Sequence, residues 1–400
     1  MSELRRALTD AACRAGAAAF APIRRRRERE LRGKPRISSV LVFNEVRGLG
    51  NMVLLSGLLL NLRRLYPGAR IAVAMPASPL APSVLGSDLV DELLCFEPAN
   101  DARRALLWFA FNVLRPRRFD LGLGTFFSPT LLASCVLAVA GCRYRIAYAQ
   151  NQRRGFLNTI TLEDAGGHEL DRHLRLLEFT GHRFERRTVK LVGPQAAREA
   201  SASLGHWRLG IERPLLGVHP GCDRLSALRR WPIERFVSVI RQVVTAGLAD
   251  AAVFLGPDEM ELRPSLEAGM GPHMRIICCD SIQTAAALIG QCQAFLSNDS
   301  GLMHVAAALG VPVVAIFGPT DALKSAPVGS AAVILAAEDV PCRPCYCGPA
   351  TTCTRDRRYC LEGIHTREVM GAVRRAHAAA RWTGSRLQTD TPARIPGHAA

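Results

Sequence analysis

The stretch that decides the fold is Phe295-Leu-Ser-Asn-Asp-Ser-Gly-Leu-Met-His304, which continues through Val305–Leu309 to Val311–Phe317. An apolar run ends at Ser297, a helical pattern follows, and a second apolar run ends in the turn Gly318-Pro-Thr-Asp321. Apolar runs that alternate with helical patterns are typical of βαβ units around a parallel sheet. The stretch therefore predicts an α/β fold in which both polar turns lie at the carboxyl edge of one sheet.

The turn between the first run and the helix has the composition of an anion site. Asp299 or Ser300 suits the N-cap, and Gly301 allows a ligand to approach the backbone closely. Free amides and the helix dipole would attract a phosphate there. His304 follows one turn later, and we expect it to face the same edge. A well-capped buried helix with a structural histidine remains the alternative interpretation.

The same alternation extends over most of the chain. Strands are expected at residues 40–43, 70–74, 93–96, 121–123, 215–218, 252–255, 275–278, 294–297 and 313–317. Helical patterns lie at residues 54–65, 130–140, 170–180, 232–245, 262–268, 284–289 and 302–309. The pattern predicts two doubly wound, Rossmann-like domains with a ligand crevice at the carboxyl ends of their strands, followed by a C-terminal amphipathic helix.

These patterns also suggest the domain boundaries. We expect a basic, flexible N-terminal arm over residues 1–36, an N-terminal domain over 37–195, a linker over 196–213 and a C-terminal domain over 214–365. The C-terminal domain would include a cysteine-rich loop at 342–360. A helix at 366–380 and a flexible tail at 381–400 would complete the chain.

Composition and charge limit the classes of protein to consider. The 400 residues are 48% hydrophobic and 22% charged, which is typical of globular domains and excludes wholesale disorder. The net charge of +16 is uneven, because residues 1–36 hold 11 basic and 4 acidic residues around Arg24–Arg27. Such a cluster suits an anionic membrane surface. No nucleic-acid-binding motif accompanies it, so we expect no nucleic-acid partner; a solvated arm without a partner is the alternative.

The sequence predicts neither a secretory signal nor a membrane span. The alanine-rich stretch Ala11–Pro22 is interrupted by Arg14, and its charges follow rather than precede it. The longest uncharged run, Thr125–Cys142, contains serine, threonine and proline and suits a buried helix better than a span. We therefore expect a cytoplasmic protein, with peripheral attachment to the inner face of the cytoplasmic membrane as a hypothesis.

Several segments, in order along the chain, resemble glycosyltransferase family 9, the bacterial lipopolysaccharide heptosyltransferase-like family. The resemblance lies in Gly48–Met52 with Leu65–Gly68, His168–Leu174, Leu216–Gly221 with Arg229–Phe236, Leu255–Glu259 and Phe295–Asp321. It covers roughly residues 38–375, nearly all of the chain outside its tails. Agreement of several ordered motifs is much stronger evidence than agreement of any one.

The resemblance implies a two-domain glycosyltransferase of the GT-B type with an interdomain cleft. The C-terminal domain would bind a nucleotide-diphosphate sugar, typically ADP-heptose, and the N-terminal domain a lipid-linked acceptor of the lipopolysaccharide-core type. Family chemistry inverts the anomeric carbon by direct displacement and needs no cofactor. That step requires a base for the acceptor hydroxyl and groups that stabilise the leaving diphosphate.

The resemblance also assigns roles to individual residues. The donor-binding residues would be His219, Arg229, Arg230, Asp258, Glu259, Asp299, Ser300, Gly301, Leu302 and His304. Arg229 stands where the family commonly has a lysine near the diphosphate, and Arg230 could substitute for it. Asp258 or Glu259 would bind the nucleoside. On the acceptor side are Gly48, Gly50 and Arg145, the last being one of seven arginines between positions 115 and 154 that we expect to meet an anionic lipid acceptor.

One departure from the family pattern concerns the catalytic base. The family's amino-terminal loop usually carries an aspartate where this chain has Asn51, and an amide cannot accept the proton. Asn51 would instead cap the following helix. Three accounts stay open: another carboxylate, with Glu45 the nearest in the loop, acts as base; positioning and leaving-group stabilisation suffice; or the chain binds without turnover. Transfer to a protein or another glycan, and a non-catalytic nucleotide-sugar-binding homologue, are therefore the alternatives.

The thirteen cysteines divide into two groups. Eight are scattered and suit small core positions. The other five lie within nineteen residues, and Cys342, Cys345, Cys353 and Cys360 have metal-ligand spacing. Similar loops occur in part of the family, with iron in a branch that modifies proteins. A structural zinc or iron ion and a loop of free thiols are both open interpretations.

Overall fold

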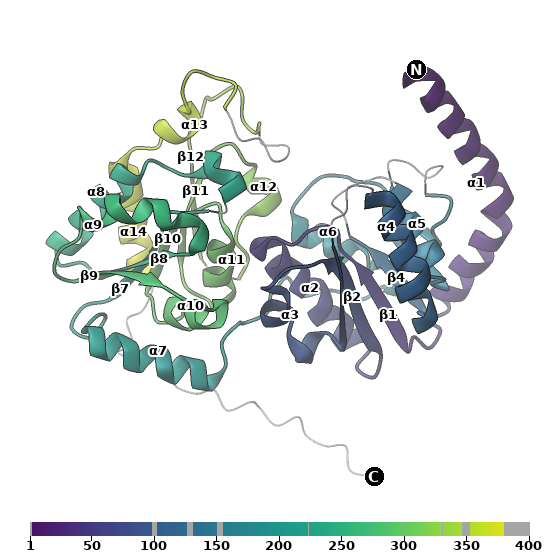
Figure 1. Ribbon diagram of the computed structural model, residues 1–400, viewed down its shortest axis with the longest axis horizontal. Helices are drawn as coiled ribbons and strands as arrows, with labels where there is room; N and C mark the ends of the chain where they lie inside the picture. The colour runs from purple at the N-terminus through teal and green to yellow at the C-terminus, as the bar shows by residue number, and fades with distance from the viewer. Residues whose placement is uncertain are drawn as a thin grey trace, which may run out of the picture. The chain divides into compact units, whose positions relative to one another are not determined.

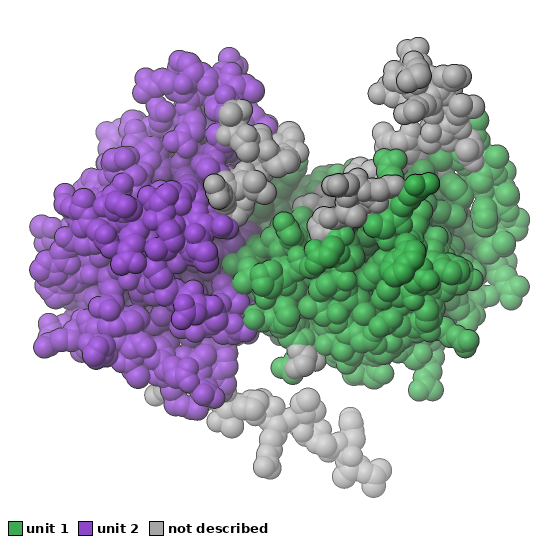
Figure 2. Space-filling model, viewed as in Figure 1, with its two compact units in different colours: residues 1–189, 323–328 green, residues 190–322, 329–400 purple. Residues whose placement is uncertain are grey.

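The chain forms two compact units, each built around its own parallel sheet (Figures 1 and 2). The computed structural model describes residues 2–97, 102–125, 131–149, 155–222, 224–329, 331–345 and 353–379. Unit 1 comprises residues 1–189 and 323–328, and unit 2 comprises residues 190–322 and 329–400. Among the described residues, no helix is long and apolar enough to cross a membrane.

Unit 1 contains a six-stranded sheet in the order β3-β2-β1-β4-β5-β6. Its strands are β1 (Ser39–Phe43), β2 (Arg70–Pro76), β3 (Glu92–Phe96), β4 (Leu121–Gly124), β5 (Tyr144–Tyr148) and β6 (Ile160–Leu162), and every pairing is parallel. Its helices are α1 (Ser2–Arg32), α2 (Leu49–Leu65), α3 (Ala81–Leu89), α4 (Ala102–Phe109), α5 (Leu131–Val139) and α6 (Glu169–Arg175), with α4 continued by the π-helical turn η1 (Ala110–Leu114) and the 3-10 turn η2 (Arg115–Arg117).

Apolar clusters of described residues hold helices of unit 1 in place. In one, Phe43 of β1 packs with Phe109 of α4 and Val136 of α5. In the other, Leu54 of α2 packs with Leu170 and Leu174 of α6. The second cluster keeps the beginnings of α2 and α6 close together, which matters for the polar residues described below.

Helix α1 differs from the expected arm. Residues 2–32 are helical because alanine and arginine favour helix and because Arg26–Glu30 and Glu28–Arg32 pair four residues apart. The end of α1 is anchored to unit 1, since Leu31 is buried and Glu30 lies 3.2 Å from a guanidinium nitrogen of Arg143.

Unit 2 repeats the same architecture, with the sheet order β12-β11-β10-β7-β8-β9. The strands are β7 (Leu215–His219), β8 (Asp250–Leu255), β9 (Met274–Cys278), β10 (Ala294–Asn298), β11 (Val313–Phe317) and β12 (Ala332–Ala336), again all parallel. The helices that matter here are α7 (Pro194–Trp207), α8 (Ile233–Thr245), α10 (Ile282–Ile289), α11 (Gly301–Ala308) and α14 (Thr366–Ala379), together with the 3-10 turns η4 (Arg224–Arg229) and η5 (Pro257–Leu262). The segment expected to link the halves contains α7, which packs against α10 within unit 2.

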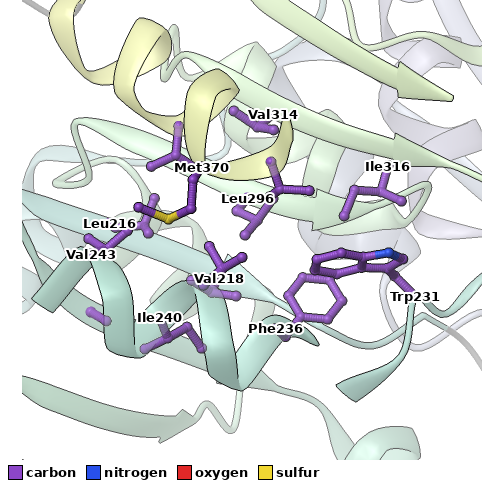
Figure 3. Close-up of a cluster of buried hydrophobic side chains, with 14 of the residues drawn as sticks. Leu216, Val218, Trp231, Phe236, Ile240, Val243, Leu296, Val314, Ile316 and Met370 are labelled. Atoms are coloured by element: carbon purple, nitrogen blue, oxygen red, sulfur yellow. The ribbon is translucent and has the colours of Figure 1, made fainter. Parts of the chain in front are cut away.

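Trp231 and Phe236 are part of the apolar core of unit 2 (Figure 3). The Trp231 ring meets the ring of Phe236 edge-on at 5.1 Å, and its indole Nε1 donates to the carbonyl of Ile364 at 3.1 Å. Met370 of α14 packs into the same cluster, so α14 buries one side on the sheet. This packing fixes the segment that carries Arg229 and Arg230.

All nine expected strands are present, and β5, β6 and β12 are additional. Strand β12 is an apolar run that the sequence analysis did not single out, whereas β5 and β6 lack the apolar run that marks the other strands. For example, β5 carries Arg145 between two tyrosines, and β6 has three residues. The long uncharged run Thr125–Cys142 begins directly after strand β4 and contains helix α5, and its residues 126–130 lie outside the described chain.

Candidate functional site

Both sheets reverse their strand order at equivalent places. In unit 1 the strands are added on one side of β1 up to β3 and then, from β4, on its other side. In unit 2 the same reversal of strand order occurs between β7 and β10. In open parallel sheets, ligands bind beyond the carboxyl ends of the strands at such a switch point. Each unit therefore has one such edge at which predicted site residues can lie.

In unit 2, buried polar side chains connect the ends of β7 and β10. Nδ1 of His219 lies 2.9 Å from the Ser300 hydroxyl, which is also 2.9 Å from the Ser297 hydroxyl. Ser300 occupies the N-cap of α11, but its hydroxyl makes no cap hydrogen bond. The expected side-chain cap is therefore absent. The amides of Gly301 and Leu302 at this helix start receive no cap from Ser300 and suit an anion.

Asn298, which the sequence analysis missed, holds this edge together. Its side-chain amide donates to the carbonyls of Pro220 (2.7 Å) and Gly221 (3.2 Å), and its Oδ1 accepts from the backbone amide of Trp231 at 3.0 Å. One fully buried side chain thus joins the loop after β7 to the arginine segment. In the sequence, the signal that could have identified Asn298 is a polar asparagine at the end of an apolar run.

The two predicted arginines have different surroundings. Nη1 of Arg229 lies 3.4 Å from Oδ2 of Asp299, which is almost fully buried. Arg230 pairs with Glu261 and donates to the carbonyls of Cys222 and Asp258 at 2.9 and 3.1 Å. Arg230 is thereby committed to holding its loops together, which makes Arg229 the better candidate to contact a diphosphate.

The two carboxylates that follow β8, Asp258 and Glu259, differ in their surroundings. Oε2 of Glu259 accepts from the amide of Gly256 at 2.6 Å, and Oε1 lies 3.6 Å from Nε2 of His219. A Cβ at Gly221 would come within 2.2 Å of Glu259 Cγ, so glycine is needed there. Glu259 is buried and used internally, whereas the exposed Asp258 is the candidate to meet a nucleoside. His304 is buried one turn into α11.

In unit 1, Glu45 follows the end of β1. It is partly buried, and within the described chain its Oε1 has no hydrogen-bond partner. Burial raises the pKa of this carboxyl to about 7. A carboxyl with such a pKa can take up a proton near neutral pH, which is the property required of a general base.

Asn51 does not cap α2. The helix begins at Leu49 with Gly48 at the N-cap, and the side-chain amide of Asn51 instead donates to Oε1 of Glu169 at 2.9 Å. A Cβ at Gly48 would come within 2.8 Å of Asn51 Oδ1, so a larger residue there would require the Asn51 side chain to shift. Gly50 lies in the same first turn.

Glu169 is the second residue that the sequence analysis missed. It begins α6, is buried, and its Oε1 lies 3.8 Å from Nε2 of His173. The sequence places it 118 residues from Asn51, so only the packing of α2 against α6 brings the two together. This part of unit 1 therefore contributes two carboxylates, Glu45 and Glu169, rather than one.

Arg145 does not join this edge. It lies near the amino end of β5, in the row of the sheet that contains Leu41, while Glu45 follows the carboxyl end of β1. Its guanidinium donates to the carbonyls of Leu157 (2.5 Å) and Cys142 (2.9 Å), and burial lowers its pKa to about 10. These contacts make Arg145 a structural residue in unit 1.

The predicted metal ligands share one pocket. Cys342, Cys345, Cys353 and Cys360 line it together with Arg357 and Arg358. Within the described part of the chain, no three histidine, cysteine or acidic side chains are grouped closely enough to hold a metal ion. Cys347 lies outside the described residues.

Known proteins share both the sequence pattern and this fold. The family model for glycosyltransferase family 9 (heptosyltransferase) matches residues 110–351. Lipopolysaccharide heptosyltransferase 2 of Escherichia coli K12 is 27% identical over 291 residues, which are 68% of this chain and 81% of that protein.

Two solved structures are similar over most of the chain. The glycosyl transferase family 9 structure from Veillonella parvula has a TM-score of 0.66 at 18% identity and covers 86% of this chain and 98% of its own. The structure of E. coli ADP-heptose LPS heptosyltransferase II has a TM-score of 0.63 at 21% identity, covering 85% and 99%. Because the family model matches more than half of the sequence, the chain belongs to glycosyltransferase family 9 and is a glycosyltransferase.

Proposed function

We propose that this protein is an inverting heptosyltransferase that transfers heptose from ADP-heptose to a lipid-linked acceptor of the lipopolysaccharide-core type. The observation that carries the proposal is the unit 2 edge, where Arg229 and the uncapped start of α11 lie beside the buried His219–Ser300 pair. This edge combines positive charge, free amides and rigid support, which suits a diphosphate leaving group.

In this account, unit 2 stabilises the charge that develops on the donor. As the bond between the anomeric carbon and the diphosphate oxygen breaks, ADP leaves with the electron pair. Arg229 and the amides of Gly301 and Leu302 would bind the diphosphate, and Asp258 would hydrogen-bond the nucleoside. Asp299 would orient Arg229, because its buried carboxylate lies 3.4 Å from the guanidinium.

Unit 1 would supply the proton acceptor. The acceptor hydroxyl oxygen attacks the anomeric carbon from the face opposite the diphosphate, and its proton passes to Glu45. The raised pKa of Glu45, about 7, and its unpartnered Oε1 within the described chain support this choice. Glu169 is hydrogen-bonded to Asn51 and would keep the loop after β1 in place.

We also propose peripheral attachment to an anionic membrane, since the acceptor is lipid-linked. Helix α1 carries Arg24–Arg27, and residues 1–36 have an excess of basic residues. Replacing Arg24–Arg27 by glutamine should weaken binding to anionic vesicles at low salt. Unchanged binding would contradict this role for α1.

A structural zinc or iron ion at Cys342, Cys345, Cys353 and Cys360 is a further part of the proposal. Four thiols lining one pocket are a donor set that suits either ion, although the described thiols are not grouped at ligand distance. Elemental analysis should find about one metal ion per chain, lost in Cys342→Ser/Cys345→Ser and kept in Cys95→Ser. A metal-free wild-type protein would contradict it.

The direct test of function is transfer in vitro. Purified protein, ADP-heptose and a heptose-deficient lipopolysaccharide core should yield a heptosylated core with inverted anomeric configuration, detected by mass spectrometry and NMR. Transfer to a protein or another glycan would correct the acceptor. Donor binding without transfer to any acceptor would indicate a non-catalytic homologue.

A further inference from the structure

Helix α4 and its continuation η1 expose an unusual row of apolar side chains. Leu107, Trp108 and Phe111 are 38%, 64% and 55% exposed. We call these three residues the aromatic stripe. Nine large hydrophobic side chains are exposed among the described residues, and three of the nine lie within the five positions 107–111. Clustered exposed apolar groups mark interaction surfaces far more often than single ones do.

The opposite side of this helix explains why the stripe faces outward. Leu106, Phe109, Ala110 and Leu114 are buried in the unit 1 core with α5 and the sheet. Residues three and four apart share a helix face, so anchoring this set leaves Trp108 and Phe111 on the other side. The stripe is thus held rigidly by a packed helix (α4 in Figure 1).

Arginines surround the aromatic stripe. Residues 102–118 contain five arginines and no acidic residue. Arg103, Arg104, Arg115 and Arg118 are exposed, and the Arg115 guanidinium lies 5.2 Å from the centre of the Phe111 ring. Positions 104, 108, 111 and 115 follow helical spacing, so arginine lies at both ends of the row.

We infer that the aromatic stripe and its arginines are a docking surface for an anionic lipid bilayer. Tryptophan, phenylalanine and leucine on a helix face with arginine around them match the interfacial layer, where apolar groups enter and cations meet headgroups. A second copy of this chain is a poorer partner, because self-association of this patch would bring two sets of arginines together. The inference rests on the proposed lipid-linked acceptor, since it places the enzyme where that acceptor is.

The experiment uses the full-length protein and vesicles of phosphatidylcholine with or without phosphatidylglycerol. Wild type should co-sediment with the phosphatidylglycerol vesicles, and Trp108→Ser/Phe111→Ser should bind them at least about tenfold more weakly. Ile211→Ser is the matched control, because Ile211 is 54% exposed and lies in unit 2; it should bind like wild type. Equal binding by the double variant and wild type would overturn the inference.

A second readout locates the contact. Brominated lipids should quench part of the tryptophan fluorescence of wild type, and Trp108→Phe should bind normally but lose that quenching. Quenching that persists in Trp108→Phe would contradict the inference, as would a wild-type dimer that the double variant abolishes.

These measurements separate the docking surface from the proposed reaction. Vesicle binding needs neither donor nor acceptor, so it can succeed where heptose transfer fails. With a lipid-free soluble acceptor, Trp108→Ser/Phe111→Ser should keep the wild-type turnover. A matching loss with the soluble acceptor would show that the stripe serves folding or catalysis instead of docking.

Discussion

The two units share a strand order but differ in how their switch-point residues are paired. In unit 2, His219, Ser300 and Glu259 are joined to one another, and Arg229 is held by Asp299. In unit 1, Glu45 keeps an oxygen without a hydrogen-bond partner in the described chain and has a pKa near 7. Paired, rigid groups suit a fixed anion, and a titratable group suits proton transfer. The same fold can therefore carry either a paired, rigid site or a titratable group, depending on its loops.

We expect the largest effect on turnover when the titratable carboxyl of Glu45 is removed. Glu45→Gln should lower kcat by about 10²–10⁴-fold, because general-base catalysis contributes that much. The wild-type rate should rise with pH through about 7, where the carboxylate forms, and this limb should vanish in the variant. Steady-state kinetics from pH 5 to 9 measure both. The matched control is Glu169→Gln; if it abolishes that limb while Glu45→Gln keeps it, the base is Glu169.

The raised pKa of Glu45 also predicts that the difference in stability between Glu45→Gln and wild type depends on pH. The pKa of the Glu45 carboxyl in the folded protein is raised, so its stabilising contribution is complete below the ordinary value of 4.5 and is lost as the pH rises through about 7. Glu45→Gln should therefore gain stability relative to wild type at pH 8 but not at pH 4. Thermal unfolding at the two pH values checks this, and an equal Tm difference at both would contradict the burial of Glu45.

A smaller effect is expected at the Asn51–Glu169 pair. Asn51→Asp would place two carboxylates across a contact that is now 2.9 Å, so it should destabilise unit 1 by about 1–3 kcal/mol without raising turnover. Asn51→Asp/Glu169→Gln restores one amide and one carboxylate and should recover the stability. Chemical denaturation measures both variants. A large gain in turnover from Asn51→Asp alone would instead mean that position 51 is the natural place for the base.

The smallest effect on the reaction is expected from a change in the core that supports unit 2. Trp231→Phe leaves a cavity where the larger ring was fully buried and loses the indole hydrogen bond to the Ile364 carbonyl, which together should cost about 2–4 kcal/mol of unfolding free energy. Donor affinity should change little, since the Asn298 contact is made by the backbone amide of residue 231. A strong loss of donor affinity would show that the indole itself shapes the donor site.

Much of the fold could be predicted because the central strands are short apolar runs between helical patterns. Strand β5 escaped prediction because arginine and tyrosine interrupt its apolar pattern, and β6 because it has three residues. The segment of helix α1 was predicted as a basic arm because of its charge, and the buried Leu31 contact could not be predicted because it depends on tertiary structure.

The site was predicted best where its residues are close in sequence. The Asp299–His304 segment could be recognised because strand, turn and helix follow one another. Glu169 could not be found, because its contact with Asn51 depends on how α2 and α6 pack. Local patterns also could not show that Glu259 and Arg230 are committed to internal contacts.

We propose that unit 2 binds the donor diphosphate and that unit 1 supplies the base. Calorimetric titration of ADP-heptose into wild type, Arg229→Ala, Glu45→Gln and the surface control Arg263→Ala tests it most directly. We expect equal affinities for wild type, Glu45→Gln and Arg263→Ala, and an affinity about a hundredfold lower for Arg229→Ala. Wild-type affinity in Arg229→Ala, or its loss in Glu45→Gln, would contradict this division of roles.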